Sequence, residues 1–181
     1  MAVLTIVKNQ YDTEEVHENL IHYAMYPKVY NNAGKNTGLN TQAEYYGGYN
    51  LFLGTSKTAV EYAGEQMLYA LQMAGKDYGQ CLKHFILSFD SEGGEGELGP
   101  EDAYRIAGTI CRNYLSPYQT FFSIHQNRST HLHIHFIVNG INIQTGYKFP
   151  DKKATYQSLK RNIGKMPELA GCKLTFGGRN Q

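Results

Sequence analysis

Four of the seven histidines of this chain lie within eleven residues, and three of them alternate with apolar residues. The run from His131 to Asn139 reads His-Leu-His-Ile-His-Phe-Ile-Val-Asn. Successive side chains of a β-strand point to opposite faces, so the three histidines share one face and the apolar residues share the other. The apolar face can be buried in a core. The imidazole face needs another explanation, because a buried imidazole without a partner is costly.

The histidine face is suited to hold a divalent metal ion. Neighbours at i and i+2 lie about 6.8 Å apart, so two imidazoles can converge on an ion at about 2.0–2.1 Å, whereas His131 and His135 are about 13 Å apart. At most two adjacent histidines of the strand can share an ion, and His125, at the end of the preceding strand, is the candidate third ligand. Three neutral nitrogen ligands leave open positions, which is typical of a catalytic ion. We expect His125, His133 and His135 to bind the metal, with His131 as the possible alternative ligand.

Length and composition indicate a single domain. A chain of 181 residues falls within the ~100–200 residues of one domain. Its 41% hydrophobic and 18% charged residues exclude a disordered tail, and no run approaches the ~18 apolar residues that span a bilayer. Cys81, Cys111 and Cys172 are odd in number and lack metal-type spacing, which favours a reducing, cytoplasmic setting. We expect a monomer that does not insert into membranes.

The remaining chain alternates between strand and helix patterns. We predict strands at Ala2–Lys8, His84–Phe89, Thr120–His125, His131–Asn139 and Lys173–Phe176. We predict helices from Thr13 to Ala24, from Ser56 to Met73, from Pro100 to Leu115 and from Ala154 to Met166. Residues 26–50, rich in Asn, Gly and Tyr, are predicted to form a long functional loop. The order indicates an α+β fold, in which helices pack on a central antiparallel sheet.

Charge is unevenly distributed along the chain. Residues 147–181 hold eight Lys or Arg and two Asp or Glu, a local balance of +6, whereas residues 1–146 carry nine against fourteen, or −5. A basic segment can follow a polyanion, although a solvated basic helix explains the charge equally well. We expect single-stranded DNA to contact the basic helix around Lys160 and Arg161 and the tyrosine-rich stretch 26–50, which offers stacking faces.

Three segments resemble the motifs of one family. Residues 131–149, reading H-L-H-I-H-F-I-V-N-G-I-N-I-Q-T-G-Y-K-F, resemble the third motif of MobA-type plasmid-mobilisation relaxases, which are His-hydrophobic-His endonucleases. Residues 83–89, K-H-F-I-L-S-F, resemble the second motif, and residues 20–27, L-I-H-Y-A-M-Y-P, resemble the first. The motifs occur in the family's order and cover roughly residues 1–165. One departure is Asn127, which stands where the family usually has an Asp.

The resemblance implies an activity and its residues. A relaxase cleaves one DNA strand at a transfer origin and stays joined to the 5′ phosphate through a tyrosine, with Mg²⁺ or Mn²⁺ as cofactor. Tyr23 matches the family's nucleophile, with Tyr26 and Tyr30 as competitors. The motif positions also imply DNA-binding or positioning roles for Ser88, Asn139 and Lys148. Relaxases are normally longer, so residues 1–181 would be either the N-terminal nuclease domain of a longer bacterial mobilisation protein or a minimal version of one. Its possible further partners are accessory mobilisation proteins and a conjugation coupling protein.

Two other functions are compatible with the histidine pattern. A phosphoesterase of RNA or nucleotides could use a His-x-His pair as acid and base. A catalytically degenerate module could recognise origin DNA without cutting it. These alternatives differ from a relaxase in one product, because only a relaxase leaves protein covalently attached to DNA.

Overall fold

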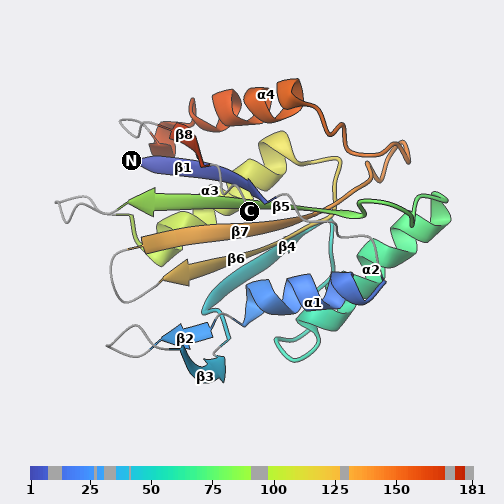
Figure 1. Cartoon of the computed structure of the whole chain (residues 1–181), viewed down its shortest axis with the longest axis horizontal. Helices are drawn as coiled ribbons and strands as arrows, with labels where there is room; N and C mark the ends of the chain where they lie inside the picture. Colours follow the sequence, from blue (N-terminus) through green and yellow to red (C-terminus); the bar gives the residue numbers. More distant parts are fainter. Residues whose placement is uncertain are drawn as a thin grey trace.

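A six-stranded sheet with helices on both faces dominates the computed structural model, which describes residues 1–7, 14–26, 28–30, 36–40, 42–90, 98–126, 131–169 and 174–177 (Figure 1). The strand order is β4-β6-β7-β5-β1-β8. Every neighbouring pair is antiparallel except β1 and β8. The strands are β1 (Ala2–Val7), β4 (Tyr45–Tyr49), β5 (Leu82–Asp90), β6 (Thr120–Gln126), β7 (His131–Asn139) and β8 (Leu174–Gly177).

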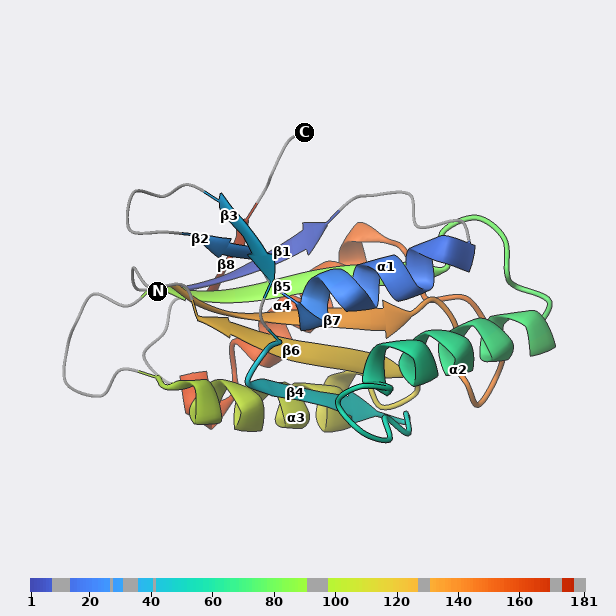
Figure 2. The same ribbon diagram turned by 90° about the horizontal axis from the view of Figure 1, so that it is seen from below.

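The helices cover the sheet in two pairs. They are α1 (Glu14–Met25), α2 (Ala59–Met73), α3 (Pro100–Tyr114) and α4 (Lys153–Ile163), with a short 3-10 turn at Pro167–Leu169. In Figure 2, α1 and α2 lie on one side of the sheet, and α3 lies on the other. A separate two-stranded sheet is formed by β2 (Lys28–Tyr30) and β3 (Asn36–Asn40).

Alternation along the strands fills a separate core on each face. The larger core joins Ile134 and Phe136 of β7 to apolar residues of β5, β6, α3 and α4. The second core joins Phe121 and Ile137 to the buried face of α1 and to α2. His133 and His135 of β7 have the parity of Ile137, so they belong to the face that α1 covers.

Residues 26–50, predicted to be a loop, instead contain three strands, and that prediction is wrong. Tyr45–Tyr49 is the edge strand β4, paired with β6. Glycine is disfavoured in strands, so the sequence Tyr-Tyr-Gly-Gly-Tyr hid the strand pattern. Packing explains one of the two glycines, because a Cβ on Gly47 would lie 2.5 Å from Cζ of Phe122. The predicted helix start at Thr13 lies outside the described residues.

Among the described helices, none combines the length and the apolar character needed to cross a bilayer.

We predict that Gly47→Ala lowers the free energy of unfolding by about 1–3 kcal/mol, because its methyl group would collide with the buried Phe122 ring. Gly108→Ala in α3 is the control, since a Cβ there meets nothing within 4 Å and alanine is favoured over glycine inside a helix. Urea unfolding measures both variants. Equal stability of the two would contradict the packing argument.

Candidate metal centre and active site

Three histidines from two neighbouring strands converge on one point. His125 of β6 is directly opposite His133 of β7, and His135 lies two residues further along β7. The ring centroids are 5.1 Å apart for His125 and His133, 4.3 Å for His125 and His135, and 5.1 Å for His133 and His135. One ring nitrogen from each lies within 4.8 Å of the other two. We call these three residues the histidine cluster.

The end of α1 orients His125. The backbone carbonyl of Ala24, in the last turn of α1, accepts hydrogen bonds from Nε2 of His125 at 2.6 Å and from Oγ of Ser123 at 2.7 Å. A carbonyl oxygen only accepts, so Nε2 of His125 carries a proton and Nδ1 of the neutral ring is left as the ligand atom. The contact also satisfies one of the carbonyls that a helix leaves unpaired at its C-terminus.

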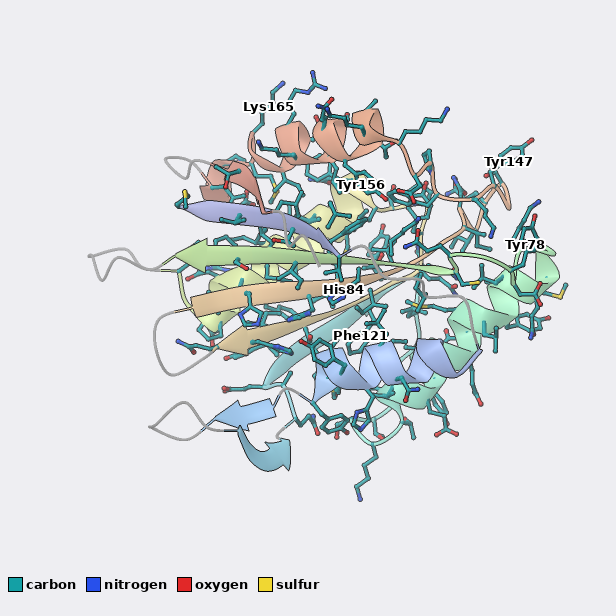
Figure 3. All side chains as sticks on the ribbon, in the orientation of Figure 1. Tyr78, His84, Phe121, Tyr147, Tyr156 and Lys165 are labelled. Atoms are coloured by element: carbon teal, nitrogen blue, oxygen red, sulfur yellow. The ribbon has the colours of Figure 1, made fainter. Side chains whose placement is uncertain are left out.

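A fourth histidine, His84 of β5, contacts the cluster from the opposite side of β7. Its Nε2 lies 2.9 Å from Nδ1 of His135, and both side chains are buried. Figure 3 labels His84 in the middle of the sheet. His84 is not among the predicted site residues, because in the sequence it stands out only as part of the second motif. The signal that could have found it is the parity of β5, because His84 and Ser88 share a face that meets the histidine face of β7.

Burial favours the uncharged form of three of these imidazoles, those of His84, His125 and His135. Burial, together with a smaller effect of the nearby His125, lowers the pKa of His84 from 6.5 to about 4. Burial also lowers the pKa of His135 well below its usual value, with smaller contributions from the neighbouring histidines. The pKa of His125 is lowered by burial as well, against the opposing effect of its bond to Ala24. Neutral imidazole is the form that binds metal ions.

Tyr23 lies beside the cluster at the surface. Its side chain is 49% exposed, and its ring meets those of His135 and His84 edge-on at centroid distances of 5.7 Å and 6.4 Å. The ring of Tyr26 instead lies 4.7 Å from that of His22 and packs against the core beneath α1. The side chain of Tyr30 lies outside the described residues. Of the predicted tyrosines whose side chains are described, Tyr23 is therefore the one that lies against the histidine cluster.

The buried face of α1 holds the backbone of Tyr23 in place. The buried side chains of the described part of α1 are Leu20, Ile21, Ala24 and Met25, and Tyr23 stands at the edge of this stripe. Because Ala24 is buried and its carbonyl is bound, the backbone next to Tyr23 is held against the sheet.

Two further predicted residues lie on the face of the sheet that carries the histidines. Ser88 of β5 is directly opposite His133 and is half-buried. Asn139, at the other end of β7, is completely buried, and its Nδ2 donates to the carbonyl of Met67 at 3.0 Å and to Oε1 of Gln119 at 2.8 Å. Asn139 has no surface to offer DNA, so of its two predicted roles only positioning is compatible with this placement.

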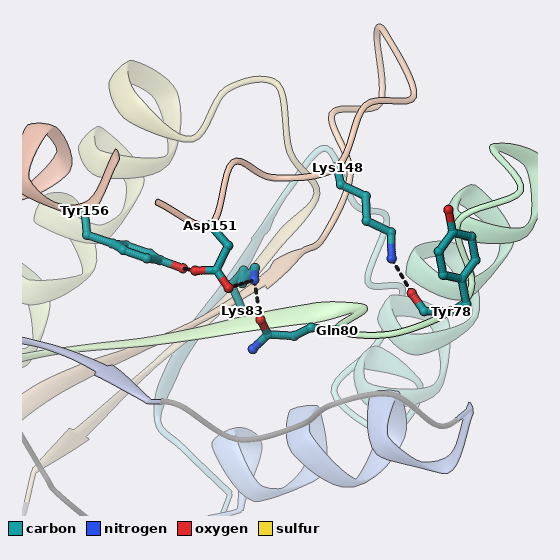
Figure 4. A network of polar contacts seen from close by, with 6 residues as sticks. All are labelled: Tyr78, Gln80, Lys83, Lys148, Asp151 and Tyr156. Carbon is teal, nitrogen blue, oxygen red and sulfur yellow. Dashed lines mark hydrogen bonds and ion pairs between the residues drawn. The ribbon is translucent and has the colours of Figure 1, made fainter. Parts of the chain in front are cut away.

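The predicted basic residues lie away from the cluster. Nζ of Lys148 donates to the backbone carbonyl of Tyr78 and lies 4.2 Å from the centre of its ring (Figure 4). Lys160 and Arg161 belong to α4, which packs on the face of the sheet opposite the histidines. The expectation that DNA contacts this helix and residues 26–50 stays a prediction, and the position of α4 puts any such contact on a different face of the sheet from the histidine cluster. Asn127 and the side chain of His131 lie outside the described residues.

A buried lysine, Lys83, has a structural role in a network of polar contacts. Lys83 is 5% exposed, and its Nζ lies 3.0 Å from Oδ2 of Asp151 and also donates to Gln80. The hydroxyl of Tyr156 donates to the same carboxylate (Figure 4). Lys83 points to the α3–α4 side of β5, so this network ties α4 to the sheet and lies outside the histidine site.

Comparisons with known proteins identify a family and a similar fold. A sequence model of the family described as "Relaxase: MobA/VirD2-like, nuclease domain" matches residues 32–168, which contain His84 and the histidine cluster but begin after Tyr23. No curated protein matches the chain. A solved structure described as "Molecular Basis of Vancomycin Resistance Transfer in Staphylococcus aureus" aligns over 99% of this chain and 98% of its own, with a TM-score of 0.57 and 10% identity. At that identity the likeness concerns the fold alone, and it confirms the predicted α+β architecture.

We predict that the metal-free protein loses stability as the pH falls from about 6.5 to about 4. In this window the imidazoles of the unfolded chain take up protons, whereas the lowered pKa of His84 keeps it neutral in the folded state. Below about pH 4, His84 is protonated in both states and its contribution stops changing. Urea unfolding with a chelator present measures the profile. His84→Gln should flatten it, and an unchanged slope in that variant would contradict the assignment.

Proposed function

The chain belongs to the MobA/VirD2-like family of relaxase nuclease domains, and we propose that it cleaves one DNA strand at a transfer origin, with Tyr23 as the nucleophile. The membership confirms the family resemblance of the sequence motifs and indicates a DNA relaxase role in mobilisation. The observation that carries the proposed mechanism is the half-exposed Tyr23 ring lying against His135 of the three-histidine cluster.

In this proposal, His125, His133 and His135 hold a divalent ion. The donor set fits one, because its three nitrogens lie within 4.8 Å of one another and burial favours the neutral forms of His125 and His135. Imidazole nitrogen suits Mn²⁺ better than Mg²⁺, which prefers oxygen. A bound ion would polarise the scissile phosphate and neutralise the charge that develops there. Neutral ligands leave the ion's full charge available to an anionic phosphodiester.

The tyrosine chemistry follows from the placement of α1. The Tyr23 oxygen would attack the phosphorus, forming an O–P bond to the 5′ phosphate while the bond to the 3′ oxygen breaks and leaves a 3′ hydroxyl. The Tyr23 hydroxyl loses its proton in this step, and the departing 3′ oxygen takes one up. The bond between Ala24 and His125 holds the neighbouring backbone in place, and such alignment is what a positioned nucleophile contributes. A phosphotyrosine retains the energy of the broken bond, so the strand can be rejoined.

The other predicted DNA-binding residues lie at different distances from the histidine cluster. Ser88, opposite His133, is the candidate for a contact near the scissile phosphate. Lys148, Lys160 and Arg161 lie away from the histidine cluster. Any phosphates they contact therefore belong to nucleotides away from the cleaved bond, and such contacts would add affinity without sequence information.

We predict that His133→Ala lowers the affinity for Mn²⁺ at least about 10-fold, because it removes one of three ligands. Calorimetry on the apoprotein measures this affinity. His22→Ala is the matched control, since His22 is an exposed histidine whose ring lies against Tyr26 outside the cluster. Unchanged Mn²⁺ affinity in His133→Ala would rule out a metal site at this position.

We predict that Tyr23→Phe abolishes the covalent protein–DNA adduct but keeps Mn²⁺ affinity, because only a hydroxyl is removed. The assay incubates the protein and Mn²⁺ with supercoiled DNA cloned from around its own gene and resolves adducts on a denaturing gel. Tyr26→Phe is the control and should still form the adduct.

Each other outcome of this assay would indicate a different nucleophile or function. An adduct mapped to Tyr26 or Tyr30 would refute Tyr23 as the nucleophile but would still support a relaxase function. Cleavage by the unmodified protein without any adduct would indicate a phosphoesterase. Binding without cleavage would indicate a recognition module.

A further inference from the structure

We infer that His84 is a positioning residue that fixes the tautomer and orientation of the ligand His135, and so the surface against which Tyr23 lies. The inference deepens the proposed function and rests on its metal site. It starts from the contact between Nε2 of His84 and Nδ1 of His135, 2.9 Å long. The two side chains are 3% and 2% exposed, so water does not compete for the bond.

The hydrogen bond decides which nitrogen of His135 can face a metal ion. A neutral imidazole has one donor and one acceptor nitrogen. Since Nδ1 of His135 is taken by His84, Nε2 is the atom left for the cluster. Nε2 can offer its lone pair only when the proton is on Nδ1, which must then donate to Nε2 of His84. Histidine ligands commonly have their second nitrogen held in this way, which fixes the ring and its tautomer.

His84, the hydrogen-bond partner of His135, differs from a carboxylate partner in its charge. A carboxylate in the place of His84 would hold the proton of His135 equally well but would add a negative charge beside the cluster. His84 is an uncharged acceptor, so it orients His135 without reducing the attraction of a bound cation for a phosphodiester. Its strand position suits this role, because it lies at the boundary between the histidines and the apolar core of Ile137 and Leu82.

The rings of His84 and His135 also form part of the surface against which the Tyr23 ring packs. The Tyr23 ring meets His135 at 76° and His84 at 75°, edge-on in both cases. The rings of His84 and His135 stack with an interplanar angle of 29°. A rotation of either imidazole would therefore change both a metal ligand and the surface beside the nucleophile. His84 thus links the two parts of the site without touching the reacting atoms.

The test compares two substitutions of His84 with a matched control on the same strand. His84→Leu keeps an apolar volume but removes the acceptor, whereas the amide oxygen of His84→Gln can accept the proton of His135 in the place of Nε2. Ile86→Ala is the control, because Ile86 is directly opposite His135 but offers no nitrogen. Calorimetry with Mn²⁺ should show affinity about 10–100-fold weaker for His84→Leu, near the unmodified value for His84→Gln and unchanged for Ile86→Ala.

A second measurement does not depend on metal. Long-range proton–nitrogen NMR spectra of the apoprotein report which ring nitrogen of each histidine is protonated. His135 should carry its proton on Nδ1 in the unmodified protein and in His84→Gln, and populate both tautomers in His84→Leu. If the unmodified protein carries the proton on Nε2, the inference is overturned even where Mn²⁺ binds.

The two measurements separate the inference from the proposed function. If the unmodified protein does not bind Mn²⁺, the metal site of the proposed function is refuted. The tautomer of His135 in the NMR spectra still decides whether His84 orients His135. Equal Mn²⁺ affinities for His84→Leu and His84→Gln would reduce His84 to a packing residue. If His84→Leu does not fold, the tautomer in the unmodified protein and the affinity of His84→Gln remain decisive.

Discussion

The alternation of β7 in the middle of the sheet is the constraint on which the rest of the structure depends. Every second side chain of this strand enters the core under α3, and the others form the face that carries the histidines. A shift of one residue would exchange the two faces. The flanking strands then complete the site, since β6 brings His125 opposite His133 and β5 brings His84 to His135.

One backbone carbonyl connects the candidate nucleophile to the candidate ligands. Ala24 accepts hydrogen bonds from His125 and Ser123 of β6, and Tyr23 precedes it in the chain. The carbonyl end of a helix carries partial negative charge, which suits a cation nearby. Docking of α1 therefore does two things at once, because it sets the tautomer of one imidazole and brings a tyrosine to the edge of another.

The buried polar groups around the histidine cluster are stabilised by hydrogen bonds. His84 is bonded to His135, His125 to Ala24, and Ser123 to the same carbonyl. Buried polar groups are tolerated when they are hydrogen-bonded and uncharged. The basic residues of α4 lie on the opposite face of the sheet, so in the proposed function an anion would be attracted to this site by the ion that the histidines would bind rather than by the lysines and arginines of that helix.

The sequence by itself determined the histidine strand, its hairpin partner, the α+β class and the family, because strand period and motif order are local properties of the chain. Only the tertiary structure brought His84 to His135 across 51 positions and selected Tyr23 over Tyr26 beside the cluster. It also turned a glycine-rich stretch into β4 and put the basic helix on the other face. These features depend on strand order and helix docking, which arise from contacts between distant residues. The strand period indicates which face a residue occupies, but it does not say which strands or helices are neighbours.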